Sequence, residues 1–379
     1  MKIEQSRWTS VKGWEPEAPG KLGQQAQLVL LFGSTSILRQ QDRVEEIRRR
    51  YPAARLFGCS TAGEIWDTLV SDDSLSLTAV QFERTRLAGT CINVNEVENS
   101  YQAGERLARS LNHDGLRHVL VLSDGLRING TDLVSGLTKH LPADVTVTGG
   151  LSGDGTSFRE TLVLWDATPA TDTIAALGLY GEHVKVGFGS LGGWDSFGPE
   201  RLVTRSKGNV LYEMDGKSAL ELYKTYLGEH AKGLPATGLL FPLCLRIREA
   251  ETGVVRTILS VDEQEHSMTF AGDVPQGAYA RLMKANSDRL IDGAVGAAKT
   301  SYAALGAVSP DLAILISCVG RKLVLKQRVE EEVEGVRDVL GGHTALTGFY
   351  SYGELSPFGP KTKCELHNQT MTVTTLTER

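Results

Sequence analysis

The chain has 379 residues, of which 41% are hydrophobic, 23% are charged and 41 are glycine. These proportions are those of a soluble globular protein and exclude disorder, collagen and coiled coil as descriptions of the whole chain. The net charge of -6 argues against a free-standing nucleic-acid binder, which more often carries a basic excess. At roughly 150 residues per domain, the length predicts two domains or one large one.

Membrane, export and metal signals are missing from the sequence. No apolar stretch approaches the ~20 residues that a membrane-spanning helix needs, and the charged N-terminus lacks the apolar segment of a secretory signal. The five cysteines form no Cys-x-x-Cys pair, and the eight histidines show no zinc-site spacing. We therefore expect a cytoplasmic protein with reduced thiols, no membrane span and no bound metal ion.

The first half of the chain predicts alternating strands and helices. Residues 1–24 are polar and are expected to form an extended lead-in, followed by an N-terminal domain over residues 25–214. Its predicted elements are strand 26–32, helix 39–51, strand 55–59, a hairpin of strands 75–82 and 87–94, helix 98–111, strand 118–122, helix 131–141, and strands 145–148, 161–165, 173–180 and 184–188.

The second half predicts a C-terminal domain over residues 215–379 in the same style. A hairpin at 202–212 is expected just before it. Its own expected elements are helix 218–227, strands 243–247, 254–261, 266–270 and 278–283, helix 288–304, strand 312–319, helix 324–339, and strands 347–350 and 364–375. The expected fold class is therefore α/β with mixed parallel and antiparallel sheets in two domains.

Small polar residues follow four predicted strands, at 33–35, 59–61, 123–125 and 148–150. Ligands of open α/β sheets bind outside the carboxyl ends of the strands, so these ends predict a binding crevice if they lie together. Ordinary turn chemistry is the alternative for each of them. The candidate ligand-binding residues at these ends are Ser34, Ser60, Thr61, Gly149 and Gly150.

Two glycine runs stand out. The run 149–155 follows a strand and has Arg159 as its nearest cation, but it lacks the lysine of a phosphate-binding loop, so a tight turn is the alternative. The run 187–193 precedes Trp194, and glycine beside an aromatic ring suits a flat ligand, with a structural hinge as the alternative. The second run adds the candidates Gly192, Gly193 and Trp194.

Enzymatic chemistry is not indicated by a motif. Nucleophilic catalysis needs a base beside the nucleophile, yet no histidine lies near a candidate serine or cysteine in sequence, and no Gly-x-Ser-x-Gly elbow occurs. We expect a protein that is not an enzyme, with a hydrolase or transferase as the alternative. The nucleophiles open to that alternative are Ser34, Cys59, Ser60, Ser123 and Cys318.

The C-terminal strand is unusually polar where His367 and Asn368 precede the apolar run 371–376. Buried polar side chains need partners, which here are the backbone, another strand or a ligand. His367 and Asn368 are therefore further candidates. We expect the ligand between the strand ends and the loop 187–197, with the strand of His367 closing one side.

Four motifs resemble the FIST family of bacterial sensory proteins, which carry an N-terminal and a C-terminal FIST domain. They are LFGSTS (31–36), LFGCSTAGEI (56–65), GGLSGDG (149–155) and GFYSYGE (348–354) with CELHNQT (364–370). The segments 192–216, 222–228 and 234–246 are similar to stand-alone members, among them the nitric-oxide-sensing haemoproteins called NosP. The resemblance implies a cytoplasmic sensor whose ligand modulates a histidine kinase or a cyclic-di-GMP enzyme, and it supplies no catalytic motif.

The same resemblance makes haem a candidate cofactor and nitric oxide a candidate ligand. Some relatives carry a histidine just before the Gly-Gly-Trp loop, where this chain has Phe188. His183 and His367 are therefore the candidate axial ligands, since a haem iron needs one proximal histidine. Other family members are thought to sense small molecules such as amino acids, which leaves a metabolite sensor without haem as the alternative.

Overall fold

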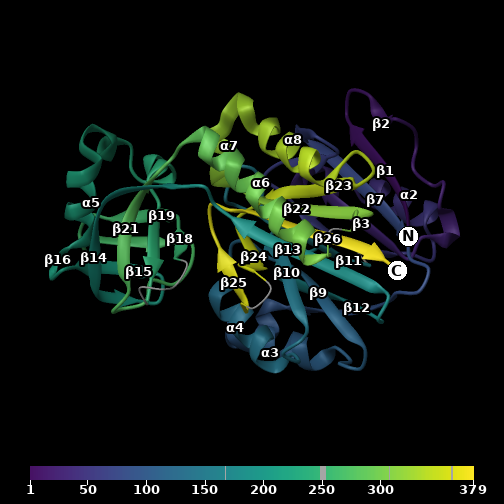
Figure 1. The fold of residues 1–379 in the computed structure, drawn as a ribbon, viewed down its shortest axis with the longest axis horizontal. Coiled ribbons are helices and arrows are strands. Elements are labelled where there is room, and N and C mark those ends of the chain that lie inside the picture. Colours follow the sequence, from purple (N-terminus) through teal and green to yellow (C-terminus); the bar gives the residue numbers. More distant parts are fainter. Residues whose placement is uncertain (167, 248–252, 307, 360–361) are drawn as a thin grey trace.

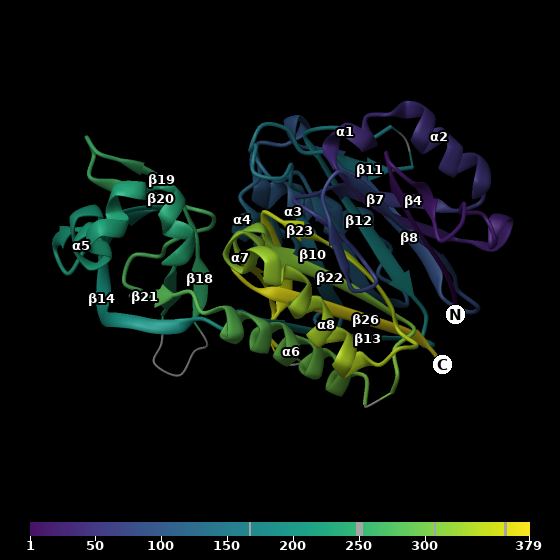
Figure 2. The same cartoon turned by 90° about the horizontal axis from the view of Figure 1, so that it is seen from above.

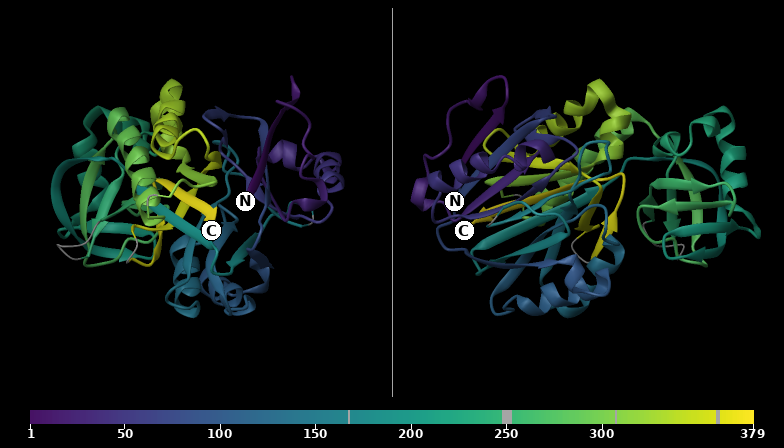
Figure 3. Two further views of the ribbon diagram at one scale, coloured as in Figure 1. Left: turned by 45° about the vertical axis from the view of Figure 1, so that its right-hand side comes forward. Right: turned by 180° about the vertical axis from the view of Figure 1, so that it is seen from behind.

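The computed structural model describes the whole chain except residues 167, 248–252, 307 and 360–361. Over the described residues, a body of three six-stranded sheets carries a small domain with an eight-stranded sheet at one end (Figure 1). The views in Figures 2 and 3 show the small domain standing to one side of the body, with a long helix leading back along it. Mixed parallel and antiparallel sheets confirm the expected fold class.

The body consists of three similar units in succession. The first contains β1 (Lys2–Thr9), β2 (Gly13–Glu15), η1 (Gly23–Gln25), β3 (Leu28–Gly33), α1 (Thr35–Leu38), α2 (Gln41–Arg50), β4 (Arg55–Ser60), β5 (Glu64–Trp66), β6 (Leu69–Ser71) and β7 (Ser74–Gln81). The second contains β8 (Arg86–Asn93), η2 (Val94–Glu96), α3 (Ser100–Ser110), β9 (Leu116–Ser123), α4 (Gly130–His140), β10 (Thr146–Leu151), β11 (Val163–Trp165) and β12 (Thr173–Tyr180).

The third unit begins with β13 (Val184–Leu191) and is then interrupted by the small domain. It resumes with α6 (Ser287–Ala304), β22 (Leu312–Cys318), α7 (Val319–Leu325), η5 (Lys326–Arg328), α8 (Val329–Leu340), β23 (Ala345–Ser351), β24 (Gly353–Pro357), β25 (Cys364–His367) and β26 (Met371–Glu378).

The small domain is inserted between β13 and α6. Its elements are β14 (Asp195–Lys207), β15 (Val210–Met214), β16 (Lys217–Ser218), α5 (Ala219–Leu227), η3 (Gly228–Gly233), η4 (Ala236–Leu240), β17 (Leu243–Arg246), β18 (Val254–Arg256), β19 (Ile258–Asp262), β20 (Ser267–Phe270) and β21 (Tyr279–Lys284). The boundary expected at residues 214 and 215 falls between β15 and β16, which pair within this domain.

Each unit pairs its strands in the same way. The strands on either side of the main helix are parallel neighbours, as β3 and β4, β9 and β10, and β22 and β23 show. The last strand of each unit returns antiparallel to the first parallel strand, and the opening strand pairs with it. This recurrence relates the three sheets by an approximate threefold repeat.

The units are also interlocked, because each lends a strand to the sheet of another. β5 of the first unit pairs with β23, β24 of the third pairs with β10, and β11 of the second pairs with β4. The exchange closes a cycle of three sheets, so no unit can complete its sheet alone.

Alternation along the strands divides the body into an inner and an outer core. Leu30 of β3, Leu120 of β9 and Ile314 of β22 belong to one central cluster that joins all three sheets. The intervening residues belong to clusters that include the covering helices, as Leu31 does with Ile47 of α2. Strands buried on both faces read as continuous apolar runs, which is why the sequence predicted them well.

Two sequence expectations are corrected. Residues 1–24 are not a lead-in outside the domain, because β1 pairs with β7 over eight residues. The hairpin expected at 75–82 and 87–94 is wrong, since β7 lies in the sheet of the first unit and β8 pairs with β12 in the sheet of the second. In both corrections, a strand pairs with a partner that is distant in sequence.

Candidate ligand cavity

A cavity of about 870 Å³ lies between the body and the small domain. Its body wall consists of the ends of β9, β10 and β22, the beginning of α7 and the turn after β25, and its other wall comes from η3, η4 and the loops at β18–β20. Small-molecule sites are typically concave, about 300–1,000 Å³ in volume and set at domain junctions. The cavity therefore has the size and position of a small-molecule site.

An aspartate at the end of β9 shapes part of the body wall. The Asp124 carboxylate accepts hydrogen bonds from the backbone N–H groups of Leu126 (2.9 Å) and Arg127 (2.7 Å). This turn leads to Asn129, which caps α4 and donates to Asp273 of the small domain at 2.9 Å. The same loop thus lines the cavity and docks the small domain.

Asn368 is the polar side chain of greatest interest in the body wall. It is 1% exposed, and neither its amide nitrogen nor its amide oxygen has a hydrogen-bond partner. From the opposite wall, Thr257 of the small domain presents a buried hydroxyl that is also unpartnered. A buried polar group without a partner costs about 1–3 kcal/mol, so a bound molecule that satisfies these groups would recover that cost.

The rest of the lining is mostly apolar and carries little charge. Among the described lining residues, Arg127 is the one charged side chain; it is largely exposed and pairs with Asp172 at 2.9 Å. The Cys318 thiol also lines the cavity, and burial raises its pKa far above the ordinary value, which keeps it protonated. The cavity is therefore suited to an uncharged ligand.

The candidates of the second glycine run lie in the connection to the small domain. Trp194 donates its indole N–H to the carbonyl of Gln369 at 2.8 Å, one residue beyond Asn368. Gly193 has φ +81°, and a Cβ there would lie 1.8 Å from the carbonyl oxygen of Arg289. Gly192, Gly193 and Trp194 do not line the cavity; they lie in the connection between β13 and β14, where a hinge of the small domain would be.

The strand ends of the first unit contribute nothing to the cavity lining. The Ser60 hydroxyl is buried and accepts from the backbone N–H of Leu162 at 2.8 Å, and the Thr61 hydroxyl donates to the Glu64 carboxylate. Ser34 lies 3.1 Å from Ser36, hydroxyl to hydroxyl. The predicted crevice thus includes the end of β9 but not the ends of β3 and β4.

Gly149 and Gly150 are buried inside β10 and do not form a loop around a ligand. A Cβ on Gly149 would lie 1.9 Å from the carbonyl oxygen of Val121 on β9, and the same clash occurs at Gly58 and Gly348 in the other two units. These glycines allow the close approach of the parallel strands. Arg159 is exposed and lies outside the cavity lining.

The two histidines proposed for haem lie far apart. His183 precedes β13 and contacts the carbonyl of Arg379 at 2.5 Å, whereas His367 is buried and its Nε2 lies 2.7 Å from the carbonyl of Ser356. Burial lowers the pKa of His367 to about 4. The strand β26 between them spans about 23 Å at 3.3 Å per residue.

The residues around the cavity do not fit haem. Both candidate histidines already face a backbone carbonyl, and neither lines the cavity. Among the lining residues that the structure describes, no imidazole is available as an axial ligand. The Cys318 thiol lines the cavity, and burial raises its pKa far above the ordinary value.

The candidate nucleophiles have no assembled base. Burial raises the pKa of the Cys59 thiol well above its ordinary value, and the buried Ser123 hydroxyl donates to the carbonyl of Asp124 at 3.0 Å. Within the described ranges, no histidine ring is hydrogen-bonded to any of the five candidates. The arrangement lacks the contact that activates a nucleophile.

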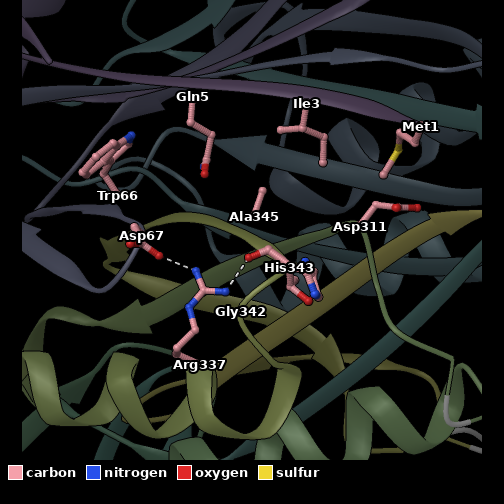
Figure 4. Close-up of a pocket in the computed structure, with 11 residues that line it drawn as sticks. Met1, Ile3, Gln5, Trp66, Asp67, Asp311, Arg337, Gly342, His343 and Ala345 are labelled. Carbon is pink, nitrogen blue, oxygen red and sulfur yellow. Dashed lines mark hydrogen bonds and ion pairs between the residues drawn. The ribbon is translucent and has the colours of Figure 1, made fainter. Parts of the chain in front are cut away.

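A second hollow of about 470 Å³ lies at the other end of the body, between β1 and the turn after α8 (Figure 4). Its cation, Arg337, is already engaged by Asp67 and by the carbonyls of Gly341 and Thr344. The hollow is more open and polar, and the described part of its lining has one buried unpartnered atom, the indole nitrogen of Trp66, against three such atoms on Asn368 and Thr257 in the larger cavity. We therefore place the candidate site at the small domain.

Sequence reasoning missed the small-domain wall, including Thr257 and the segment 233–239. It also missed the threefold repeat, although a signal is present: Gly-x-x-Thr-x-Gly-Glu at 58–64 recurs with serine as Gly-x-x-Ser-x-Gly-Glu at 348–354. In both copies the hydroxyl donates to the glutamate three residues later.

The described residues show neither a membrane-spanning helix nor a metal-binding cluster. No described helix has the length and apolar character required to cross a bilayer. Likewise, the described part of the chain contains no group of three or more metal-ligating side chains.

Comparison with known proteins identifies the family. A protein of Methanocaldococcus jannaschii named only as uncharacterised is 23% identical over 354 residues, covering 86% of this chain, and the chain spans 65% of that relative's length. A chorismatase crystal structure aligns over 99% of this chain and 98% of its own at 9% identity and a TM-score of 0.34. Cyanuric acid hydrolase from A. caulinodans aligns over 100% and 99% at 8% identity and a TM-score of 0.38.

The TM-scores of these two alignments, 0.34 and 0.38, are too low to say anything about the chemistry of the chain. Two family descriptions do match it, the FIST N domain over residues 27–217 and the FIST C domain over residues 219–357. FIST domains are generally sensory domains in signal transduction. The chain belongs to the FIST family.

Proposed function

We propose that the chain is a ligand-binding sensor and not an enzyme, and that its ligand occupies the cavity between the body and the small domain. The observation that carries this proposal is Asn368, whose buried amide lacks any hydrogen-bond partner in the wall of a cavity of about 870 Å³. The candidate nucleophiles, in contrast, lack a base, so no observation favours a hydrolase.

The position of the cavity suits a sensor. A ligand that touches both walls binds the closed arrangement of body and small domain more tightly than an open one, and so shifts their populations. The turn that holds Asn368 also binds Trp194 in the hinge, through the Gln369 carbonyl. Ligand binding at Asn368 is thereby connected to the segment about which the small domain would move.

The output of the sensor is proposed to pass to a separate protein. FIST relatives suggest a histidine kinase or a cyclic-di-GMP enzyme as that partner, and the ligand-dependent position of the small domain would change the surface offered to it. We propose a small molecule other than haem, and therefore a signal other than nitric oxide bound to haem, because the described lining contains no histidine to serve as the axial ligand.

The test is to fill the cavity. Ala236 is exposed and lines it, so Ala236→Trp should block binding without disturbing the core. Ala143→Trp, at an exposed position outside the lining, is the matched control. A metabolite library is screened by thermal shift with the native chain and both variants.

We expect compounds that stabilise the native chain and Ala143→Trp but not Ala236→Trp. Such a compound should also change the autophosphorylation of a histidine kinase encoded beside the chain, or the activity of a neighbouring cyclic-di-GMP enzyme. Hits that stabilise all three proteins equally would place the ligand elsewhere and overturn the proposed site.

A further inference from the structure

The polar groups of the cavity restrict the chemistry of its ligand. Resting on the proposed function, we infer that the ligand is an uncharged, largely apolar molecule whose polar edge carries a hydrogen-bond donor next to an acceptor. A lactam, a cis-amide and the edge of a nucleobase all have this arrangement. Asn368 is the residue that binds this polar edge, and Thr257 supplies a second contact from the small domain.

The carboxamide of Asn368 offers one acceptor, Oδ1, and one donor group, Nδ2, side by side, and both are unpartnered. A planar edge with a donor beside an acceptor satisfies both atoms at once, as when asparagine binds the adenine edge. A carboxylate has only acceptors and would leave Oδ1 unpaired, whereas an ammonium group has only donors and would leave Nδ2 unpaired.

The charges around the cavity point to the same ligand class. Bringing a charged group into an apolar site costs several kcal/mol unless a counter-charge pairs with it. Among the described lining residues, the one charged side chain, Arg127, is occupied by Asp172. A free amino acid, with two charges, would find no buried partner for either in the described lining.

A buried cation of the small domain lies outside the cavity lining. Arg256 is 5% exposed and is not a lining residue. Its Nη1 donates to the carbonyls of Leu366 (3.0 Å) and Val255 (3.3 Å), and its Nε donates to the carbonyl of Asp273 (3.1 Å). The Nε and Nη1 atoms of this guanidinium are thus bonded to backbone carbonyls, and the bond to Leu366 ties the small domain to β25.

The apolar part of the ligand has surfaces to pack against on both sides. Ile258 and Phe270 line the small-domain wall, and Val319 lines the body wall. At the body wall, the Phe158 ring stacks on Tyr352 with centroids 4.4 Å apart and planes inclined by 13°. A flat, apolar body with one polar edge therefore matches the lining.

The experiment uses matched triplets of fragments. One triplet is 2-quinolinone, its N-methyl derivative and quinoline-2-carboxylate; further triplets place the same three groups on other aromatic and alkyl bodies. Binding to the full chain is measured by calorimetry, and repeated with Asn368→Leu, Thr257→Val and Ala236→Trp. Asn368→Leu keeps the side-chain volume and removes both hydrogen-bonding atoms.

We expect at least one lactam to bind, with N-methylation and Asn368→Leu each weakening it at least tenfold and Thr257→Val weakening it less. Asn368→Leu should leave the affinity of the N-methyl derivative nearly unchanged. Ala236→Trp should abolish binding, and the carboxylates should not bind.

Three results would overturn the inference: binding of the carboxylates in preference to the lactams, lactam binding that survives Asn368→Leu, or no binding by any member at millimolar concentration. Charged ligands that Ala236→Trp excludes would refute the ligand class and leave the proposed function intact. Lactam binding that Ala236→Trp does not affect would refute the proposed site itself.

Discussion

At the scale of single side chains, Asn368 differs from His367 and Thr370 on the same turn. His367 faces the Ser356 carbonyl, and Thr370 donates its hydroxyl to Glu354 at 3.0 Å, so both are satisfied within the fold. Asn368 is as deeply buried and has no partner. Such a group lowers the stability of the free protein in favour of the bound one.

Removing this amide should therefore not destabilise the protein without ligand. We expect Asn368→Leu to leave the free energy of unfolding unchanged or to raise it by about 1–2 kcal/mol, because two unsatisfied atoms are lost. Ser60→Ala is the contrast, since it leaves the buried Leu162 N–H without an acceptor. It should lower the free energy of unfolding by about 1–3 kcal/mol. Urea unfolding measures both; a large loss in Asn368→Leu would show that its amide is bonded within the fold.

Two buried carboxyls make stability depend on pH. Burial raises the pKa of Glu64 to about 7 and that of Glu354 to about 8, despite the hydrogen bonds that each accepts. In the unfolded chain the pKa of glutamate is about 4.3, so the folded state binds these protons more tightly. Their contribution is therefore greatest at low pH and is lost as the pH rises through the folded values.

We expect the free energy of unfolding to fall between pH 6.5 and 8.5, and to fall less in Glu64→Gln combined with Glu354→Gln. This window excludes the buried histidines, whose lowered pKa values of about 3 for His118 and about 4 for His367 affect stability at lower pH. Urea titrations at successive pH values are the measurement. An undiminished fall in the double variant would contradict the assignment.

The sequence predicts a site residue only where the residue type and its neighbours in the chain indicate burial or a need for a partner. Asn368 was predicted because a polar residue beside a buried strand needs a partner wherever it folds. Thr257 was not, because a threonine within a predicted strand gives no sign that its hydroxyl will face a cavity. Ser60, Thr61 and Gly149 were predicted from their strand-end positions, yet contacts within the fold account for them.

At the scale of elements, the three glycines of the parallel strands are among the most constrained positions. We expect Gly149→Ala to cost more than about 3 kcal/mol, because the new Cβ would lie 1.9 Å from the Val121 carbonyl oxygen and φ is +156°. Gly342→Ala, with no atom within 4 Å, should change stability by less than about 0.5 kcal/mol. Equal denaturation midpoints for the two variants would refute this close strand approach.

The helix α7 connects the cavity wall to the hinge. Its residue Arg321 is buried, pairs with Glu332 at 2.7 Å, and donates to the carbonyls of Gly192 and Leu290. These two carbonyls belong to the two segments that connect the small domain to the body. Arg321 therefore holds both connections from a helix whose first residues line the cavity.

We expect Arg321→Met to cost about 3–5 kcal/mol, because it leaves the Glu332 carboxylate buried and unpaired. Arg321→Met combined with Glu332→Leu should recover most of this loss in chemical denaturation. Hydrogen exchange at residues 192–194 should stay faster than in the native chain in both variants, since the hinge contact is not restored. Unchanged hydrogen exchange at these residues would show that Arg321 does not stabilise the hinge.

Elements defined by local signals were predicted well. The helices α4 and α5 begin where expected, because Asn129 and Ser218 cap them with their side chains. The hairpin at 75–94 failed because strand pairing depends on distant partners. Alternation of apolar residues identifies a strand but does not say which sheet it joins.

The whole molecule is organised by exchange between repeated units. Each sheet of the body is completed by a strand from another unit, so the body folds as a closed cycle. The sequence shows this only weakly, because the three units pack against different helices with different side chains. The small domain breaks the third unit, and the cavity forms where that insertion meets the ends of the body strands.

The central claim is that a ligand in this cavity draws the small domain and the body together. Hydrogen exchange, with and without the compound that stabilises the chain most, tests it directly. We expect slower exchange at 125–130, 233–239, 257–259 and 368–370, which form the two walls, and no change at 341–345 in the far hollow. Protection confined to the far hollow, or to the body wall alone, would contradict the claim.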